Sequence, residues 1–197
     1  MFELFTIGHS IHSVECFTEL LHIHDITALC DVRSSPYSRF SPQFNRETLK
    51  DELAKHHITY IYLGTELGPR SSDPTCYEKG KVQYNRLAAR DIFHQGLGRL
   101  RKGMTAYRIA LMCAEKDPIT CHRMLLICRH LRNDDINIRH ILDDGALEDN
   151  YDAEVRLMQQ VKIDPTDLFY TEEEQIQRAY DIQGEKIAYT LQEGQDV

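Results

Sequence analysis

The hydrophobic positions of the chain fall into five short runs that are rich in β-branched and aromatic residues. These runs cover residues 4–7, 27–32, 58–63, 107–113 and 136–142. Segments with the 3.6-residue apolar period of a helix separate most of them, so the pattern predicts a β-α-β alternation. Crossovers of this kind favour a mostly parallel sheet of about five strands with helices on both faces. The expected fold class is α/β, a Rossmann-like three-layer sandwich.

Polar residues mark the expected starts of three helices. Ser13, Asn45 and Thr120 each precede an apolar helical pattern. Their side-chain oxygens are expected to accept the free N–H groups of the first turn. Further along, residues 171–182 read as a helix, and KIAYTL after Gly184 reads as a terminal strand or extended segment.

The length and the charge distribution indicate how the chain is organised. A chain of 197 residues with 42% hydrophobic content suits one domain over 1–197. We expect a core over about 4–142 and an appendage over 143–197. Residues 1–140 carry 19 Lys and Arg against 16 Asp and Glu, whereas residues 141–197 carry 4 against 15. A mildly basic body of this kind can present a local positive cleft, although a solvated acidic surface is the simpler interpretation of the tail.

The segment MFELFTIGHS has no basic leader before its apolar run, and it therefore predicts a strand rather than a signal peptide. The sequence contains no apolar run near the roughly 18 residues of a membrane span. Six cysteines, three of them inside apolar runs, indicate reduced thiols rather than a disulfide framework. We therefore expect a cytoplasmic protein without a membrane partner, and the oligomeric state stays open.

Polar residues stand where the predicted strands end. Gly8-His9-Ser10, Asp31-Val32-Arg33 and Cys113-Ala114-Glu115 each follow an apolar run, and His140 lies near the end of the fifth. Ligands of open α/β sheets bind beyond the carboxyl ends of the strands, where such residues meet. Any single polar ending is common for reasons of solvation alone. The joint pattern predicts a polar, anion-seeking cleft.

The segment CAEKDPITCHR, residues 113–123, is the sharpest local feature. If Thr120 caps a helix, the next three residues occupy its first turn, where the helix dipole favours anions and lowers a thiol pKa. Cys121 is then a candidate nucleophile, His122 a candidate acid or base, and Arg123 a candidate clamp for phosphate or carboxylate. In a purely structural alternative, Cys121 packs inward and Arg123 pairs with Glu115 or Asp31.

The segment RSSPYSRFSPQFNR, residues 33–46, interleaves basic and aromatic residues. Guanidinium groups bind phosphates and rings stack on bases, so the pattern suits a nucleotide or nucleic acid. Alternatively, the rings merely anchor the loop on the core. The residues concerned are Arg33, Arg39, Arg46, Tyr37, Phe40 and Phe44.

Several residues have the types that bind metals, namely Cys113, Cys121, His122, His9 and Asp31. Their spacing matches none of the usual zinc signatures. We therefore predict no metal site, and the sequence identifies no cofactor.

Four motifs resemble the domain-of-unknown-function family numbered 488. They are TIGHS at 6–10, CDVRSSPYSRFSPQFN at 30–45, YLGTELG at 62–68 and CAEKDPITCHR at 113–123, and the resemblance covers roughly 4–142. It implies a compact α/β fold with the motifs clustered in space, and it implies no activity. The candidate site residues that it implies, without roles, are Gly8, His9, Ser10, Asp31, Arg33, Ser38, Arg39, Glu115, Cys121, His122 and Arg123.

The leading hypothesis is an enzyme, a hydrolase or transferase, that acts on a phosphate-bearing ligand such as a nucleotide or nucleic-acid component. Its expected catalytic residues are Asp31, Glu115, Cys121 and His122. Its expected ligand-binding residues are Gly8, His9, Ser10, Arg33, Ser38, Arg39 and Arg123. One alternative is a non-catalytic nucleic-acid-binding module. The other is a thiol-based redox or sulfur-transfer protein that uses Cys121, although no glycine-bearing loop separates this cysteine from Arg123.

Overall fold

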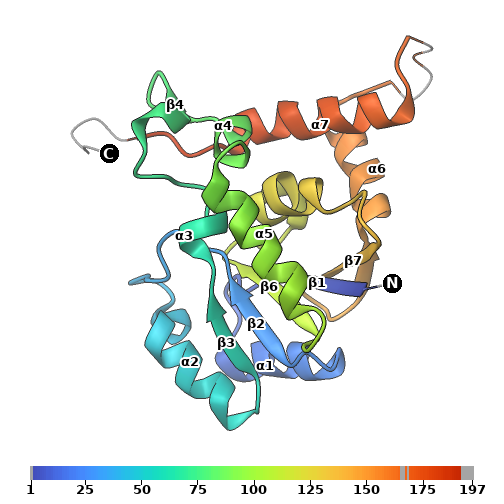
Figure 1. Cartoon of the computed structure of the whole chain (residues 1–197). Helices are drawn as coiled ribbons and strands as arrows, with labels where there is room; N and C mark the ends of the chain where they lie inside the picture. The colour runs from blue at the N-terminus through green and yellow to red at the C-terminus, as the bar shows by residue number, and fades with distance from the viewer. Residues whose placement is uncertain (1, 165–166, 168, 192–197) are drawn as a thin grey trace.

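A six-stranded sheet in the order β3-β2-β6-β1-β7-β8 forms the centre of the protein (Figure 1). We describe it from a computed structural model that covers residues 2–164, 167 and 169–191. Five strands run parallel, and β8 pairs antiparallel with β7. The predicted mostly parallel sheet is confirmed, with one short edge strand added. The strands are β1 (Phe2–Gly8), β2 (Ala28–Asp31), β3 (Thr59–Tyr62), β6 (Ile109–Cys113), β7 (Ile136–Ile141) and β8 (Leu147–Asp149).

Helices cover both faces of this sheet and complete the expected three layers (Figure 1). Successive strand side chains point to opposite faces. Accordingly, Leu4 of β1 packs into the core beneath α5, α6 and α7, whereas Phe5 and Ile7 pack into the core beneath α1 and α2. The helices are α1 (Val14–Ile23), α2 (Arg46–Lys55), α3 (Gly64–Leu67), α4 (Tyr84–Ala88), α5 (Asp91–Gly103), α6 (Asn150–Gln160) and α7 (Glu172–Ile187).

The long connection from β3 to β6 contains structure of its own. A short hairpin of β4 (Tyr77–Glu78) and β5 (Lys81–Val82) precedes α4 and α5. This connection therefore contains two helices, α4 and α5. Within the described residues, the helices are all too short or too polar to span a bilayer.

The acidic segment after residue 142 packs onto the rest of the protein through α6 and α7. Tyr180 of α7 is fully buried in the larger core. The sequence predicts a terminal strand or an extended segment in KIAYTL, and the strand is wrong, because α7 runs through Ile187. Beyond the helix the chain is extended, and Thr190 forms an isolated bridge to Lys81. Gly184 does not break the helix. A Cβ there would lie 3.3 Å from the ring of Tyr84, so this glycine allows α7 to approach α4 closely.

The three predicted helix caps have different outcomes. Ser13 is confirmed as a cap, because its Oγ accepts the N–H of Cys16. Asn45 precedes α2, but its side chain accepts the N–H of Ser38 instead. The Thr120 cap is also wrong, since Thr120 Oγ1 donates to the carbonyl of Asp117.

The physical reason for the Thr120 error lies three residues earlier. Asp117 accepts the N–H of Ile119 and starts the 3-10 turn η3 (Pro118–Thr120). Thr120 therefore ends a turn, and Cys121 is extended. The helical segment follows as the short π-helix η4 (Arg123–Ile127) and the 3-10 turn η5 (Cys128–His130).

Candidate functional site

The end of β6 and the turn after it bring four metal-binding or proton-binding side chains together. Cys113 is the last residue of β6, and Glu115 lies two positions further on. The 3-10 turn then returns the chain, so that the donor atoms of all four side chains lie within 4.8 Å of one another. We call this group the strand-end cluster; it consists of Cys113, Glu115, Cys121 and His122.

Hydrogen bonds connect the members of the strand-end cluster. Glu115 Oε2 accepts from the thiols of Cys113 and Cys121 across 2.8 and 3.1 Å. His122 Nδ1 lies 3.5 Å from Cys113 Sγ and 3.8 Å from Cys121 Sγ. Cys113, Cys121 and His122 are only 4%, 0% and 3% exposed, whereas Glu115 is exposed. The cluster is thus a buried centre with one residue open to the surface.

The ring of His122 is fixed from its other side. Its Nε2 lies 3.0 Å from the main-chain oxygen of Val32, at the end of β2. A carbonyl oxygen only accepts hydrogen bonds, so Nε2 donates in this contact. In the tautomer protonated at Nε2 alone, Nδ1 presents a lone pair to the two thiols.

Cys121 begins the helical segment in place of Thr120. Its carbonyl accepts the N–H groups of Met124 and Leu125, and its Sγ accepts the N–H of Arg123 across 3.4 Å. Burial raises the pKa of the Cys121 thiol, but its hydrogen bond with Cys113 and the charge of Arg123 outweigh burial and hold the pKa well below its usual range. Burial and the same neighbour raise the pKa of Cys113. Of the two thiols, Cys121 is therefore the one whose ionised form its neighbours stabilise.

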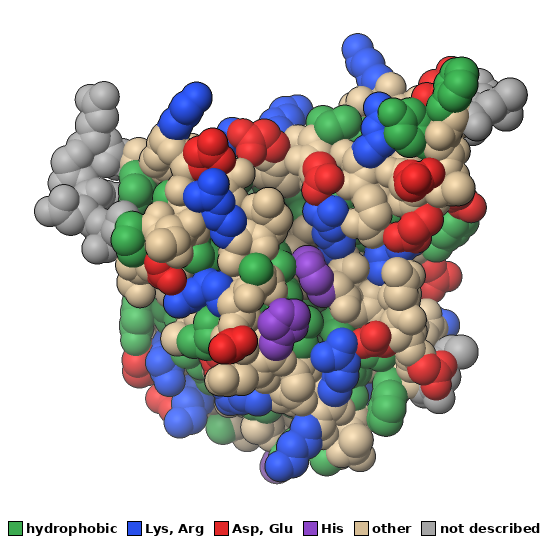
Figure 2. Space-filling view, turned by 45° about the horizontal axis from the view of Figure 1, so that its top comes forward, with side chains coloured by type: hydrophobic (Ala, Val, Ile, Leu, Met, Phe, Trp, Pro, Cys, Tyr) green, Lys and Arg blue, Asp and Glu red, His purple; other side chains and the backbone are tan. Residues whose placement is uncertain are grey.

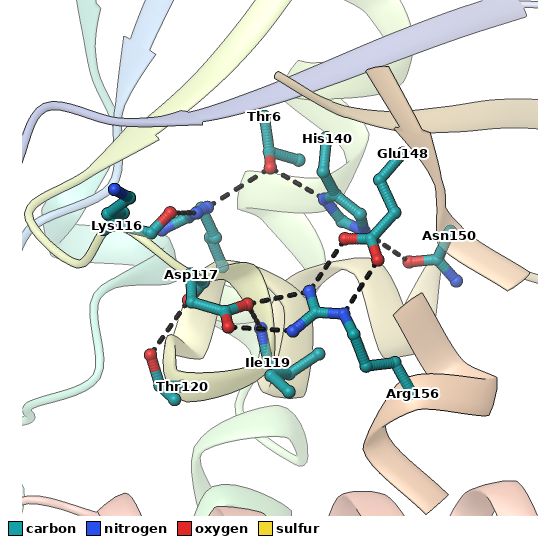
Figure 3. Close-up of polar contacts among 10 residues, drawn as sticks. Thr6, Lys116, Asp117, Ile119, Thr120, His140, Glu148, Asn150 and Arg156 are labelled. Atoms are coloured by element: carbon teal, nitrogen blue, oxygen red, sulfur yellow. Dashed lines mark hydrogen bonds and ion pairs between the residues drawn. The ribbon is translucent and has the colours of Figure 1, made fainter. Parts of the chain in front are cut away.

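A hollow of about 1030 Å³ adjoins the cluster at Glu115. Arg156 lies between Asp117 and Glu148 and is ion-paired with both (Figure 3). Figure 2 shows histidine side chains near the middle of one face, with charged side chains of both signs around them.

Although Glu115 is exposed, its carboxylate turns inward, and the resulting loss of hydration together with the charge of Cys121 raises its pKa. The hollow is lined by Glu115, Lys116, Asp117, Thr120, Leu142, Asp143, Asp144, Glu148 and Arg156.

Arg123, an expected anion clamp, binds protein groups instead. It is fully buried, and its guanidinium donates to the carbonyls of Glu115 and Lys116 at 2.6 and 2.9 Å. Its Nε donates to Thr6 Oγ1 at 3.2 Å. The guanidinium therefore fixes the main chain of the turn that carries Glu115, and pairs with neither of the carboxylates considered from the sequence.

Asp31 and Arg33 form a buried ion pair beside the strand-end cluster. Arg33 donates to the carboxylate through Nη2 at 2.6 Å, through Nε at 2.9 Å and through its main-chain N–H at 3.1 Å, and the Tyr60 hydroxyl adds a fourth hydrogen bond. Arg33 Nη1 lies 3.3 Å from His9 Nε2. Burial first, and then the charge of Arg33, lowers the pKa of His9 to about 4. These residues adjoin the cluster through Val32, which His122 contacts.

The remaining expected residues shape the surrounding main chain. A Cβ at Gly8 would clash with the carbonyl oxygen of Glu115, so glycine allows β1 to end against the turn. Ser10 donates its N–H to Ala114 and adopts a left-handed conformation. Ser38 Oγ accepts main-chain N–H groups of its own loop, which also carries the exposed Arg39.

The sequence indicated Cys113 only as one of several possible metal ligands, and it gave no role to Tyr84. Cys113 and Glu115 are two positions apart, and the strand period of two was the available signal that they share a face. Tyr84 lies on α4, where burial, followed by the charges of Cys121 and Glu115, raises its pKa. No local spacing indicates that α4 approaches the cluster.

Together, the fold and the cluster define an α/β protein with a cysteine, histidine and glutamate centre at the strand ends. The family model described as "Domain of unknown function DUF488" matches residues 13–129, more than half of the chain. The chain belongs to this family. The strand-end cluster lies within the matched residues, whereas the TIGHS motif at 6–10 precedes them. A search of curated proteins and a search of solved structures gave no match.

Proposed function

We propose that the protein is a hydrolase whose reacting centre is the strand-end cluster, with Glu115 as the group that moves the proton. One observation carries the proposal: the Glu115 carboxylate contacts both buried thiols while the residue opens onto the hollow. A concave site with convergent polar groups is the common arrangement of an enzyme centre. In this role Glu115 accepts a proton from the attacking water, a contribution of about 10²- to 10⁴-fold in rate.

The neighbours of Glu115 support this role by holding its main chain in place. Arg123 binds the carbonyl of Glu115 from inside, and Gly8 leaves room for the same carbonyl group. The main chain that carries the carboxylate is thus fixed beside the hollow. Arg123 acts as a positioning residue here, because its guanidinium is buried and faces the protein.

The ligand that we propose is a small phosphate ester, and Lys116 is the residue that supports it. Its ammonium lines the hollow next to Glu115 and pairs at 2.5 Å with Asp143. Exposed ion pairs of this kind contribute only about 0–1 kcal/mol, so the ammonium can exchange Asp143 for a phosphate oxygen. Arg33 and Arg123 are engaged within the protein. The negative charges of the carboxylates around the hollow repel a polyanion more strongly than a ligand with one phosphate group, so they favour the smaller ligand.

Hydrolysis of a panel of phosphate esters tests this function, with p-nitrophenyl phosphate and nucleoside monophosphates as probes. We expect Glu115→Gln to lower kcat by at least about 100-fold. Lys116→Ala should raise KM with a smaller change in kcat. Glu19→Gln, on the exposed side of α1, is the matched control and should behave like the unchanged protein. Unchanged kcat in Glu115→Gln would contradict the assignment.

The loop before α2 supports a second candidate function, nucleic-acid binding. Phe40 is 95% exposed, next to Arg39, on a loop tied together by hydrogen bonds of Ser38 and Asn45. An ordered, exposed ring stacks on bases and an adjacent guanidinium binds phosphate. Such stacking contributes about 1–3 kcal/mol per base.

Fluorescence anisotropy with single-stranded DNA and RNA at low salt tests this second function. Phe40→Ala and Arg39→Ala should each weaken binding, and binding should weaken further as salt rises. Phe169→Ala removes an equally exposed ring from another part of the chain, at 93% exposure, and serves as the control. Equal binding by all three variants would exclude the loop.

The thiol-transfer alternative has less support, because Cys121 Sγ is fully buried behind Glu115. A ligand atom reaches it only when the Glu115 carboxylate moves aside. All six cysteines are free, which suits the reducing cytoplasm that we propose as the location.

A further inference from the structure

We propose that the strand-end cluster binds one Zn²⁺ ion. Cys113, Cys121 and His122 supply two sulfurs and one nitrogen, and Glu115 supplies an oxygen at an exchangeable fourth position. Thiolate, imidazole and carboxylate are the ligands that zinc takes in proteins. The inference deepens the proposed hydrolase function and rests on it for the role of the ion. The binding itself rests on the donor geometry.

The distances between donors agree with a tetrahedral zinc site. Zinc bonds of about 2.0–2.3 Å place neighbouring donors roughly 3.3–3.8 Å apart. His122 Nδ1 lies 3.5 and 3.8 Å from the two sulfurs. Glu115 Oε2 is nearer to the sulfurs, at 2.8 and 3.1 Å, because it accepts their hydrogens. Binding of Zn²⁺ replaces those two thiol protons, which leave to solvent, and no oxidant or reductant is required.

Groups around the cluster orient the donors as a zinc site requires. A zinc-binding histidine typically donates its other ring N–H to a carbonyl or carboxylate. His122 does so to Val32, which leaves Nδ1 free to bind the ion. The sulfur of Cys121 accepts the main-chain N–H of Arg123, a bond that stabilises a thiolate. Two thiolates and one carboxylate around Zn²⁺ leave one net negative charge, and the buried guanidinium of Arg123 offsets it.

The burial of the donors indicates how the ion enters the site and which role it has there. Closed zinc sites are structural, whereas catalytic sites have three protein ligands and one open position. Here three donors are buried and the fourth, Glu115, opens onto the hollow. An ion reaches the sulfurs when the Glu115 carboxylate moves aside, and water takes its place. A zinc-bound water has a pKa of about 7, which makes hydroxide available for hydrolysis at neutral pH.

Spectroscopic titration of the full chain with Co²⁺, followed by displacement with Zn²⁺, tests the proposal. The reduced protein is first freed of metal by dialysis against a chelator. We expect the thiolate-to-cobalt charge-transfer band to saturate at one Co²⁺ per chain and to disappear with one equivalent of Zn²⁺. Two protons per ion should be released in weak buffer. Cys113→Ser and Cys121→Ser should abolish the band, and Glu115→Gln should lower affinity at least about tenfold.

Cys16→Ser is the matched control, since Cys16 is an exposed thiol on α1, outside the cluster. It should titrate like the unchanged protein. The proposal is overturned if the unchanged protein gives no charge-transfer band, or if the band persists in Cys113→Ser and Cys121→Ser. Should these variants fail to fold, alkylation of the Cys16→Ser protein decides the matter. One equivalent of Zn²⁺ should slow modification of Cys113 and Cys121 at least tenfold, and an unchanged rate overturns the proposal.

The two proposals fail in distinguishable ways. Metal binding is measured without substrate, so a stoichiometric cobalt band together with no ester hydrolysis supports the zinc site and contradicts the hydrolase. Hydrolysis at the full rate by metal-free protein supports the hydrolase and overturns the role of the ion.

Discussion

The ring of His122 donates from Nε2 to the main-chain oxygen of Val32 across 3.0 Å, and this bond joins the turn after β6 to the end of β2. It sets the direction of Nδ1 toward Cys113 and Cys121. The same bond gives the main-chain oxygen of the buried Val32 a hydrogen-bond partner. His122 thus has a structural role on one side of its ring and a donor role on the other.

Two substitutions of His122 separate these roles. His122→Phe leaves the Val32 carbonyl without its partner and should lower the free energy of unfolding by about 1–3 kcal/mol. His122→Gln retains an N–H donor of similar reach and should recover most of that stability, while cobalt affinity falls in both. Urea unfolding and cobalt titration measure the two effects. Equal stability of the two variants would contradict a structural role of the Nε2 bond.

Arg123 is expected to matter for stability before it matters for any ligand. Arg123→Met leaves the partly buried carbonyls of Glu115 and Lys116 without this donor. An unpaired oxygen costs about 1–3 kcal/mol when it is fully buried, so for two partly buried oxygens we expect the variant to lose about 2–4 kcal/mol in urea unfolding. Arg123→Lys should recover little, because one ammonium cannot reproduce the fork of the guanidinium. A loss below about 0.5 kcal/mol would show that the guanidinium does not hold the turn.

Gly8 should be intolerant of substitution because β1 ends against the turn of Glu115. Gly8→Ala places a Cβ against the Glu115 carbonyl, so the turn must shift. We expect a loss of about 1–3 kcal/mol in unfolding free energy, together with weaker cobalt binding. Gly98→Ala is the control, since a Cβ there meets open space within α5. That change should be neutral or stabilise the protein by up to about 1 kcal/mol. Equal effects of the two substitutions would contradict the close approach.

Acid should destabilise the protein through His140. Its ring is buried between Thr6 and Asn150 (Figure 3), and burial first, then the charge of Arg123, lowers its pKa to about 3. The unfolded chain binds a proton at this residue below a pH of roughly 6.5, whereas the folded chain does not bind it until about pH 3. The contribution of His140 to stability is therefore present above pH 6.5 and is lost as the pH falls toward 3.

Urea unfolding across a pH series measures this effect. The slope expected from one such histidine is about 1.4 kcal/mol per pH unit between the two pKa values. His140→Gln should remove that part of the slope, and the buried His9, whose pKa is lowered to about 4, should account for a further part. An identical slope in His140→Gln would contradict the buried neutral state of the ring.

Residue patterns located the strands and one edge of the sheet. The five apolar runs correspond to the five parallel strands, because buried parallel strands require continuous apolar sequence. The same reasoning placed Glu115, Cys121 and His122 at the strand ends, where they meet. The Thr120 cap failed because Asp117 and Pro118 start a tighter turn first. Asp117 and Thr120 can both cap a helix or turn, and the sequence did not show which of them would do so.

The sequence did not show which groups the arginines bind. Arg33 and Arg123 are similar in the sequence, each following a strand or turn, yet one binds a carboxylate and the other binds main-chain oxygens. Every residue has a main-chain carbonyl, so the sequence does not show which carbonyls accept hydrogen bonds from side chains. An arginine that donates to main-chain carbonyls therefore looks the same in the sequence as an arginine that binds an anionic ligand. The approach of Tyr84 from α4 depends likewise on tertiary packing.

X-ray diffraction at the zinc absorption edge, from crystals of the reduced protein equilibrated with one equivalent of Zn²⁺, tests most directly whether the four side chains form one metal centre. We predict a single anomalous peak about 2.3 Å from the sulfurs of Cys113 and Cys121 and about 2.0–2.1 Å from His122 Nδ1, with the Glu115 carboxylate or a water completing the tetrahedron. An anomalous peak elsewhere, with the two thiols still hydrogen-bonded to Glu115, would contradict the account.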